Sequence, residues 1–392
     1  MPGTELFDRM EIEAVTDVLE RKMVHRYSSH AARKGIYRVA EFEKALAKRV
    51  GAKYAQAVSN GTSALFVALK AAGVKPGDEV ITSAFTFIAT VEAITGCNAV
   101  PVLADIDETL GMTAESVESK ITPKTKAIMP VHMFGAATRM EPILELGKKY
   151  GIPVIEDACE VTGGTYKGKA LGTFGLCGTF SFDPNKYITV GEAGAIVTDD
   201  EKFYKTCEYY HDHGHVHRMD IERGAEEKCG LGLNFRISEI EGALGLVALK
   251  KMDKGMSLLR SIKKRVVEGV ADTGLKRRDV VNPDGDIATH IVFLLPDEKF
   301  ARAFQKVTAE EGMPVGIIAD NTWHYAKHWK ALDALSGTDI CGTKAPSYAP
   351  ESMAITESVL SRAVFYCPAL LTNDETVNKM IATLRKAAKA VL

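Results

Sequence analysis

Neither sign of charge dominates this chain, because 49 Lys and Arg residues face 51 Asp and Glu residues and leave a net charge of −2. Without a large positive excess there is no field to attract nucleic acids or anionic membranes. The apolar runs are short and broken by charges, so none is long enough to cross a bilayer. The N-terminus also lacks the basic start and apolar run of a signal peptide. We therefore expect a cytoplasmic protein that binds neither nucleic acid nor membrane.

The seven cysteines lack the CxxC spacing of a zinc site and the pattern of a disulfide framework. They are expected to be reduced, buried thiols: Cys97, Cys159, Cys177, Cys207, Cys229, Cys341 and Cys367. The stretch His211–Arg218, HDHGHVHR, could place several imidazoles on one face of a strand and so form a metal site. Neither an HExxH pattern nor a nearby cysteine pair accompanies it. A histidine-lined substrate loop is the more economical interpretation, and no metal is expected.

A length of 392 residues predicts two or three domains. From about residue 50, a helix-type pattern (NGTSALFVALKAAGV) alternates with apolar strand-type runs such as GDEVITSAF, TKAIMPVHMFG and IPVIEDA. Apolar strands separated by helices predict an α/β fold with a mostly parallel sheet covered on both faces. Ligands of such sheets collect at the carboxyl ends of the strands. A long amphipathic helix beginning near Asn234 would lead into a smaller C-terminal α+β domain, giving expected domains of 1–250 and 251–392.

The motif SNGTSAL combines a helix start with Gly61 and the hydroxyl of Thr62. Free backbone amides at a helix start, a glycine that allows close approach and a hydroxyl can together hold a phosphate. A simple Ser or Asn N-cap explains the same letters. The motif matches neither the P-loop pattern nor GxGxxG, which disfavours a nucleotide-binding interpretation of those types.

Two further stretches carry reactive side chains. VIEDACE ends an apolar strand with Asp157, which would need a cationic partner if buried. FSFDPNKYITVGEAG contains Ser181, a possible phosphate ligand, and Lys186, whose amine could attack an aldehyde if burial or a neighbouring charge keeps it partly neutral. Taken separately, Asp157 could simply cap a turn and Lys186 could be an ordinary surface lysine.

In their order, SNGTSAL, GDEVITSAFTFIAT, PVHMFG, VIEDA, GTFSFDPNK, GEAGAIVTDD and GLNFRISEIEGALG resemble the DegT/DnrJ/EryC1/StrS family of sugar aminotransferases. The resemblance implies the three-layer fold of type I pyridoxal-phosphate-dependent transferases. It also implies a homodimer with shared active sites and L-glutamate as amino donor. Carried over to this sequence, it implies that Lys186 forms the Schiff base and that Asp157 pairs with the pyridine nitrogen. It implies that Phe87 stacks on the cofactor ring and that Asn234 reaches the phosphate of the other subunit's cofactor. The remaining implied cofactor contacts are Gly61, Thr62 and Ser181.

Three positions depart from the family pattern. Glu160 stands where Gln or His is usual near the cofactor's phenolic oxygen, so it is expected to be protonated, turned away or used for another contact. Ala193 replaces a glycine of GEGG, and Tyr187 follows the lysine where Asn is common. None of these changes removes a catalytic group.

The acceptor sugar is less strongly indicated. The basic stretch HRYSSHAARKGIYR, the histidine-rich loop and NTWHYAKHW suggest contacts to an anionic substrate from Arg26, His30, His215, His324 and Tyr325. We expect amination of the C8 aldehyde of 8-oxo-3-deoxy-manno-octulosonate, which gives 8-amino-3,8-dideoxy-manno-octulosonate for lipopolysaccharide. A nucleotide-linked keto-sugar of the GDP-perosamine or UDP-amino-sugar type is the alternative, since its diphosphate fits a basic entrance nearly as well.

Two other functions remain to be weighed against amino transfer. Relatives that use the same cofactor for dehydration carry His in place of the lysine, which Lys186 argues against. A non-catalytic regulatory homologue would be free to lose Asp157, Ser181 or Lys186, yet all three are present.

Overall fold

Two sheets lie side by side in the N-terminal part of the chain. The computed structural model describes residues 2–218, 221, 224–226 and 230–392. Parallel bridges between Ile128 and Val154 and between Val131 and Asp157 join the two sheets. Every neighbouring pair is parallel except those of β9, which runs antiparallel to both β1 and β8. The predicted mostly parallel sheet is thus confirmed, with strand orders β1–β9–β8–β5 (Tyr54–Val58, Gly194–Thr198, Cys177–Ser181, Ile155–Asp157) and β3–β2–β4 (Val100–Ala104, Glu79–Ser83, Thr125–Met129).

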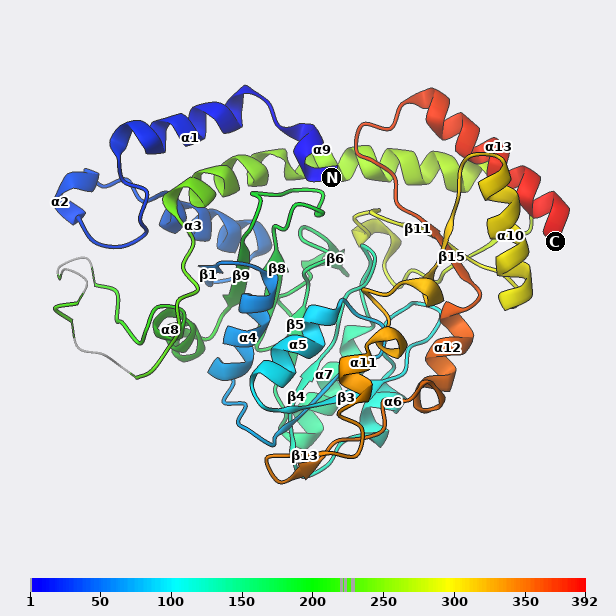
Figure 1. Cartoon of the computed structure of the whole chain (residues 1–392). Coiled ribbons are helices and arrows are strands. Elements are labelled where there is room, and N and C mark those ends of the chain that lie inside the picture. The colour runs from blue at the N-terminus through cyan, green and yellow to red at the C-terminus, as the bar shows by residue number, and fades with distance from the viewer. Residues whose placement is uncertain (1, 219–220, 222–223, 227–229) are drawn as a thin grey trace.

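Helices cover both faces of these sheets, as apolar strands require. Alternate residues of a strand point to opposite faces, so Ile81 packs in one buried cluster and its neighbour Val80 in another. The cluster of Ile81 includes residues of α3 (Arg38–Val50), α7 (Met140–Tyr150) and α9 (Glu239–Gly269). The cluster of Val80 includes residues of α4 (Gly61–Ala71), α5 (Ile88–Gly96) and α8 (Glu201–Tyr210). This is the predicted three-layer arrangement (Figure 1).

Helix α9 connects the two parts of the molecule and runs along the top of Figure 1. It contacts α1 (Arg9–Arg21) and α3, and it also contacts α13 (Asp374–Val391). The helix begins later than the sequence pattern predicted, because Ser238 and Glu241 form a capping box that fixes its first residue at Glu239. The predicted boundary near residue 250 falls inside this helix, and the division into 1–250 and 251–392 stays a prediction.

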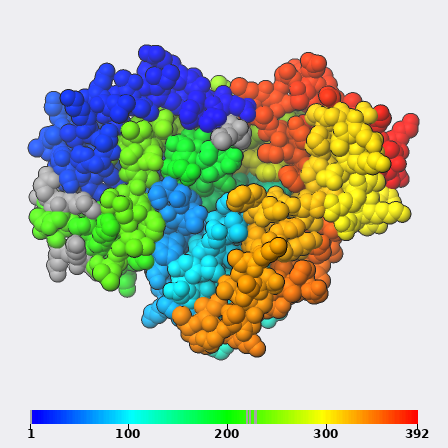
Figure 2. Space-filling view, in the orientation of Figure 1, coloured from blue at the N-terminus to red at the C-terminus, as the bar shows by residue number. Residues whose placement is uncertain are grey.

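An antiparallel sheet organises the C-terminal part, in the order β10–β11–β15–β12 (Lys276–Arg277, Ile291–Leu294, Ala363–Tyr366, Gly316–Ile317). Phe304 of α10 (Glu298–Glu310) and Leu384 of α13 belong to one buried cluster with Phe85 and Phe134 of the N-terminal part. The two parts therefore share a core. Figure 2 shows the N-terminal helices at one end of the molecule and the C-terminal part at the other.

A segment of the C-terminal part returns to the central sheet and brings two aromatic residues to the start of α5. Phe85 and Tyr325 form an antiparallel bridge. The backbone N–H of Thr86 donates to the carbonyl of His324 at 2.9 Å, and that of Ile88 donates to Trp323 at 2.9 Å. These bonds fix Trp323 and His324 at the carboxyl end of β2, where ligands are expected.

The remaining elements are short. The 3₁₀ turns are η1 (Pro2–Leu6), η2 (Pro283–Gly285), η3 (Ile318–Asp320), η4 (Ala326–His328) and η5 (Pro350–Met353). The small helices are α2 (His30–Arg33), α6 (Ala114–Ser119), α11 (Lys330–Asp333) and α12 (Ala354–Leu360), and the small hairpins are β6–β7 (Thr165–Tyr166, Lys169–Ala170) and β13–β14 (Asp339–Ile340, Thr343–Lys344). Within the described part of the chain, no helix is both long and apolar enough to cross a membrane.

Candidate active site

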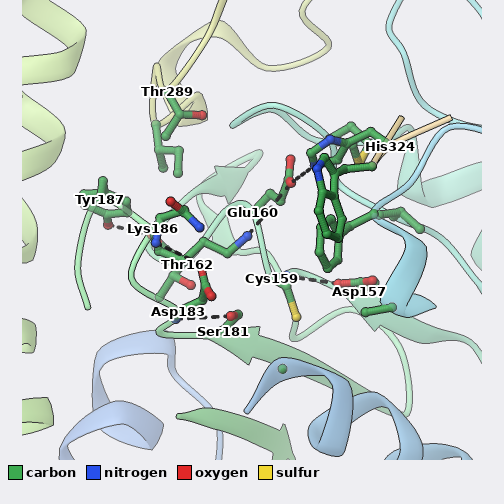
Figure 3. A pocket seen from close by; sticks show the side chains of 18 of the residues that line it. Asp157, Cys159, Glu160, Thr162, Ser181, Asp183, Lys186, Tyr187, Thr289 and His324 are labelled. Atoms are coloured by element: carbon green, nitrogen blue, oxygen red, sulfur yellow. Dashed lines mark hydrogen bonds and ion pairs between the residues drawn. The ribbon is translucent and has the colours of Figure 1, made fainter. Parts of the chain in front are cut away.

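A cavity of about 630 Å³ lies at the carboxyl ends of β5 and β8, beside the N-terminus of α4. The C-terminal part closes it with Thr289, His290, Trp323, His324 and Cys367. Figure 3 shows side chains from these separate elements facing the same space. The cavity brings together most of the residues that the sequence suggested as site residues: Gly61, Thr62, Phe87, Asp157, Glu160, Ser181, Lys186 and His324.

One end of the cavity is built to hold an anion. Helix α4 starts at Gly61, and the Asn60 side chain caps it by accepting a hydrogen bond from the Ser63 N–H at 2.8 Å. The other N–H groups of the first turn have no partner within the helix, and the helix dipole places positive potential there. Ser181 lies opposite, so close that a Cβ at position 61 would stand 2.9 Å from the Ser181 Cβ. The two interpretations of this motif are therefore compatible: the Asn60 side chain caps the helix, and Gly61, which has no side chain, leaves space for a phosphate.

A buried carboxylate lies elsewhere in the same cavity. Asp157 is 4% exposed, and its two oxygens accept hydrogen bonds from the Thr90 hydroxyl at 2.7 Å and the Cys159 N–H at 3.1 Å. A second hydroxyl, that of Thr86, lies 2.6 Å from Thr90 and extends this chain of hydrogen bonds. Among the described residues, no Lys, Arg or His forms an ion pair with Asp157. A buried anion is stabilised by a cationic partner, and a protonated pyridine nitrogen bound in the cavity would supply one.

Lys186 reaches into the cavity beside Glu160. Its Nζ lies 3.9 Å from Glu160 Oε1, and its side chain is 23% exposed. Glu160 is not turned away from the cavity, and its contacts with Lys186, His324 and the Phe134 N–H agree with the third expected alternative. Burial alone raises the pKa of this carboxyl, but the charges of His324 and Lys186 outweigh that effect and bring the pKa well below its usual range. Glu160 also accepts hydrogen bonds from the Phe134 N–H at 3.1 Å and from His324 Nε2 at 3.0 Å.

The other two departures from the family pattern have structural explanations. Tyr187 is buried, and its hydroxyl donates to the carbonyl of Thr162 at 2.6 Å. Glycines 163 and 255 make room for it, since a Cβ at Gly163 would lie 2.9 Å from the hydroxyl and one at Gly255 3.0 Å from the ring. Ala193 is likewise buried, and its carbonyl accepts the Phe182 N–H. Both residues pack the loop that carries Lys186 rather than removing a reactive group.

An aromatic pair covers part of the cavity. Phe87, suggested from the sequence as a stacking residue, is 37% exposed and stacks on Trp323 with ring centroids 5.9 Å apart and planes 11° apart. Trp323 itself is 63% exposed. Together they give the cavity an apolar wall that a flat ring can contact.

Five of the suggested residues do not line this cavity. Asn234 is exposed and lies in an antiparallel bridge with Asp212. Tyr325, which forms the bridge with Phe85, is fully buried. The other three lie near a smaller cavity or its rim and already have partners: Arg26 with Glu43, His30 with the hydroxyl of Tyr37 at 2.9 Å, and His215 with Glu226.

Three of the four histidines of HDHGHVHR, at positions 211, 215 and 217, contact other protein groups through their rings. His211 Nε2 lies 3.0 Å from the Tyr27 hydroxyl, and His217 stacks on the Tyr27 ring and pairs with Asp212 at 3.2 Å. Within the described ranges, no group of three His, Cys, Asp or Glu residues is placed to hold a metal ion. Six cysteines are free thiols there, and Cys229 lies outside the described residues. Cys341 and Cys367 are exposed, so the prediction that all the thiols are buried was wrong for these two.

Several cavity residues escaped sequence reasoning. Thr90 lies on α5, a turn beyond Phe87, and its contact with Asp157 depends on how α5 packs against the sheet. His290 and Thr289 precede β11, far along the chain from every motif. Trp323 also lines the cavity, and the sequence hinted at it because it belongs to the aromatic and basic stretch NTWHYAKHW.

The comparisons with known proteins agree with this geometry. Residues 8–385 match the DegT/DnrJ/EryC1/StrS aminotransferase family. GDP-perosamine synthase from Caulobacter vibrioides is 44% identical over 220 residues, which are 56% of this chain and 58% of that synthase. This match thus spans less than two thirds of the relative's length. Spore coat polysaccharide biosynthesis protein SpsC from Bacillus subtilis is 37% identical over 303 residues, 76% of this chain and 75% of that protein.

A solved structure has the same fold over nearly the whole chain. The crystal structure of 3-amino-5-hydroxybenzoic acid synthase superimposes with a TM-score of 0.82 at 27% identity, covering 98% of this chain and 97% of that one. The amine of Lys186, the buried carboxylate of Asp157 and the anion cradle at Gly61 fit pyridoxal phosphate. The chain belongs to the DegT/DnrJ/EryC1/StrS aminotransferase family, whose enzymes depend on pyridoxal phosphate.

Proposed function

We propose that the protein transfers an amino group from L-glutamate to a carbonyl carbon of a sugar, with pyridoxal phosphate as cofactor. The observation that carries this proposal is the convergence of Lys186, Asp157 and the α4 N-terminus on one cavity, although they lie far apart in the sequence. The bound cofactor supplies an aldehyde that holds the amino group and a ring that withdraws electrons from the reacting carbon.

Each residue then has a distinct task. With the cofactor bound, the amine of Lys186 would hold its aldehyde carbon, and when free it would move a proton from the donor's α-carbon, as a general base and then as a general acid. Asp157 keeps the pyridine nitrogen protonated, held in place by Thr90 and the Cys159 N–H. The start of α4, Thr62 and Ser181 bind the phosphate. Phe87, stacked on Trp323, packs against the cofactor ring and excludes water.

For the acceptor, we propose a nucleotide-linked keto-sugar, with a GDP-linked sugar as the first candidate. A relative at 44% identity is named a GDP-perosamine synthase, and one at 37% a polysaccharide biosynthesis protein. The basic stretch that suggested the octulosonate aldehyde is largely occupied by internal ion pairs, which weakens that choice: Arg26 pairs with Glu43, Arg33 with Glu239 and Arg38 with Asp17. No comparison supports the octulosonate.

We also propose that two copies of the chain share each active site. No arginine of the described chain lines the cavity, although the cofactor and both substrates are anionic. Asn234, expected to contact the partner's cofactor, lies outside its own chain's cavity and is exposed.

The visible spectrum of the purified protein tests the proposal. We expect an absorption band from the linkage with Lys186, which disappears in Lys186→Ala and is bleached by L-glutamate. Lys202→Ala, at an exposed position on α8, is the matched control and should keep the band. A protein that binds no cofactor would contradict the proposal, and one that binds it but never responds to an amino donor would be a regulatory homologue.

Amino transfer to a panel of acceptors tests the substrate. The panel contains GDP-linked and UDP-linked 4-keto-sugars and the octulosonate aldehyde. We expect turnover with a nucleotide-linked sugar. Turnover with the octulosonate alone would overturn the choice of acceptor and leave amino transfer intact.

A further inference from the structure

The ring of His324 lies between two hydrogen-bond acceptors. Its Nδ1 is 3.0 Å from Asn321 Oδ1, and its Nε2 is 3.0 Å from Glu160 Oε1. The orientation of the Asn321 amide is fixed, because Oδ1 also accepts the backbone N–H groups of Trp323 at 3.0 Å and His324 at 3.2 Å. A neutral imidazole has one N–H, whereas an imidazolium has two. Only the protonated ring donates to both acceptors, so the geometry favours a charged His324.

Glu160, the other member of this pair, is held in the ionised form. One of its oxygens faces His324, and the other accepts the Phe134 N–H at 3.1 Å. Its side chain is 13% exposed, so solvent screens the carboxylate only weakly. Figure 3 shows Glu160 between Lys186 and His324.

This placement raises a problem for Lys186. A carboxylate 3.9 Å from Nζ favours the ammonium form of the lysine, and an ammonium group can neither link to an aldehyde nor accept a proton. A neutral side chain at position 160, such as glutamine, would not create the conflict.

We propose that His324 is a positioning residue whose fixed positive charge neutralises Glu160, so that this carboxylate orients Lys186 without locking its amine in the ammonium form. The inference rests on the proposed role of Lys186. Glu160, His324 and Asn321 form one hydrogen-bonded unit beside Lys186. The unit connects the loop that carries Lys186 to residues 321–325 of the C-terminal part.

Other titratable groups surround the pair. Burial lowers the pKa of His290 to about 3, so its ring is neutral near pH 7. The thiol of Cys367 lines the same cavity. The remaining groups are Arg278, buried behind the cavity, and four that line it: Asp157, Cys159, Asp183 and Glu192. Among the residues that the structure describes, Lys186 and His324 are the two cationic groups within ion-pair distance of Glu160.

The first test measures the protonation of His324 directly. Nitrogen-15 NMR of histidine-labelled apoprotein, assigned with His324→Asn, should show both ring nitrogens protonated at pH 8. In Glu160→Gln one ring nitrogen should have lost its proton at the same pH, because the anionic acceptor is gone. His328, whose Nε2 faces only the Ala319 carbonyl at 2.7 Å, is the internal control. A His324 that is neutral at pH 7 in the wild-type apoprotein overturns the inference.

The second test is a double-mutant cycle read by spectroscopic titration. In the cofactor-loaded protein, the absorbance of the Lys186 linkage reports the pKa of its nitrogen. His324→Asn leaves Glu160 uncompensated and should raise that pKa by about 1 unit or more. Adding Glu160→Gln should return it to the wild-type value, and His328→Asn should leave it unchanged. A purely structural role for His324 predicts no such rescue.

Failure of the inference is distinguishable from failure of the proposed function. If Lys186→Ala abolishes the linkage band but His324→Asn titrates like wild type, the pairing hypothesis is wrong and the cofactor assignment stands. If the band survives in Lys186→Ala, the proposed function itself fails. Loss of cofactor from His324→Asn leaves the NMR measurement to decide.

Discussion

The phosphate cradle gives the sharpest quantitative prediction, through the substitution Gly61→Ala. An added Cβ would lie 2.9 Å from Ser181 Cβ, 3.2 Å from its Oγ and 3.3 Å from Cys159 Sγ. Carbon atoms in ordinary contact are about 3.5–4.0 Å apart. Ser181 must therefore move, and it cannot rotate out of the way because the clash is with Cβ, next to the backbone of β8. Overpacking of this kind costs about 1–3 kcal/mol.

That strain falls on the two elements proposed to bind the phosphate, so it should appear mainly as lost cofactor affinity. A cost of about 1–3 kcal/mol raises a dissociation constant by roughly 5-fold to 150-fold. Titration of apoprotein with pyridoxal phosphate, followed by absorbance, measures it. Gly96→Ala, whose Cβ would meet Phe66 at an ordinary 3.4 Å, is the control and should bind normally. Unchanged affinity in Gly61→Ala would refute the cradle.

Three further predictions follow from the site. Asp157→Asn should bind cofactor but lose at least about 100-fold in kcat, because removing one partner of a buried ion pair costs about 3–5 kcal/mol; wild-type kcat would contradict the proposed pairing. Tyr187→Phe should lose about 1–2 kcal/mol of unfolding free energy in urea, because the buried Thr162 carbonyl loses its donor, whereas Tyr150→Phe at an exposed hydroxyl should lose almost nothing. His290 should make stability fall as pH drops from its unfolded pKa of 6.5 towards its folded pKa of about 3, since the unfolded chain binds the extra proton there. In His290→Asn, the free energy of unfolding should depend less steeply on pH in acid. An unchanged dependence would mean that other groups cause the loss of stability.

The parts of the site that lie within one motif were predictable from the sequence. Asp157 and Lys186 each stand beside a strand with a recognisable apolar pattern, and the carboxyl ends of such strands meet at one edge of a sheet. The layered fold followed from the same alternation of strands and helices.

Contacts across the two parts of the chain were not predictable. His324 reaches Glu160 only because the segment around Tyr325 pairs with Phe85, and the local amino-acid sequence does not specify that pairing. The sequence raised the question of Glu160 but offered three answers, and the choice depended on a partner 164 residues away. The suggested substrate contacts Arg26, His30 and His215 illustrate the same limit, because local charge says nothing about which acids a folded chain places beside it.

The most direct test of the central claim is to locate the cofactor on the chain. Purified holoprotein is reduced with borohydride, which makes the linkage permanent, and is then digested and analysed by mass spectrometry. The account predicts that the cofactor's added mass appears on Lys186. Modification of another lysine, or no modification at all, would contradict it.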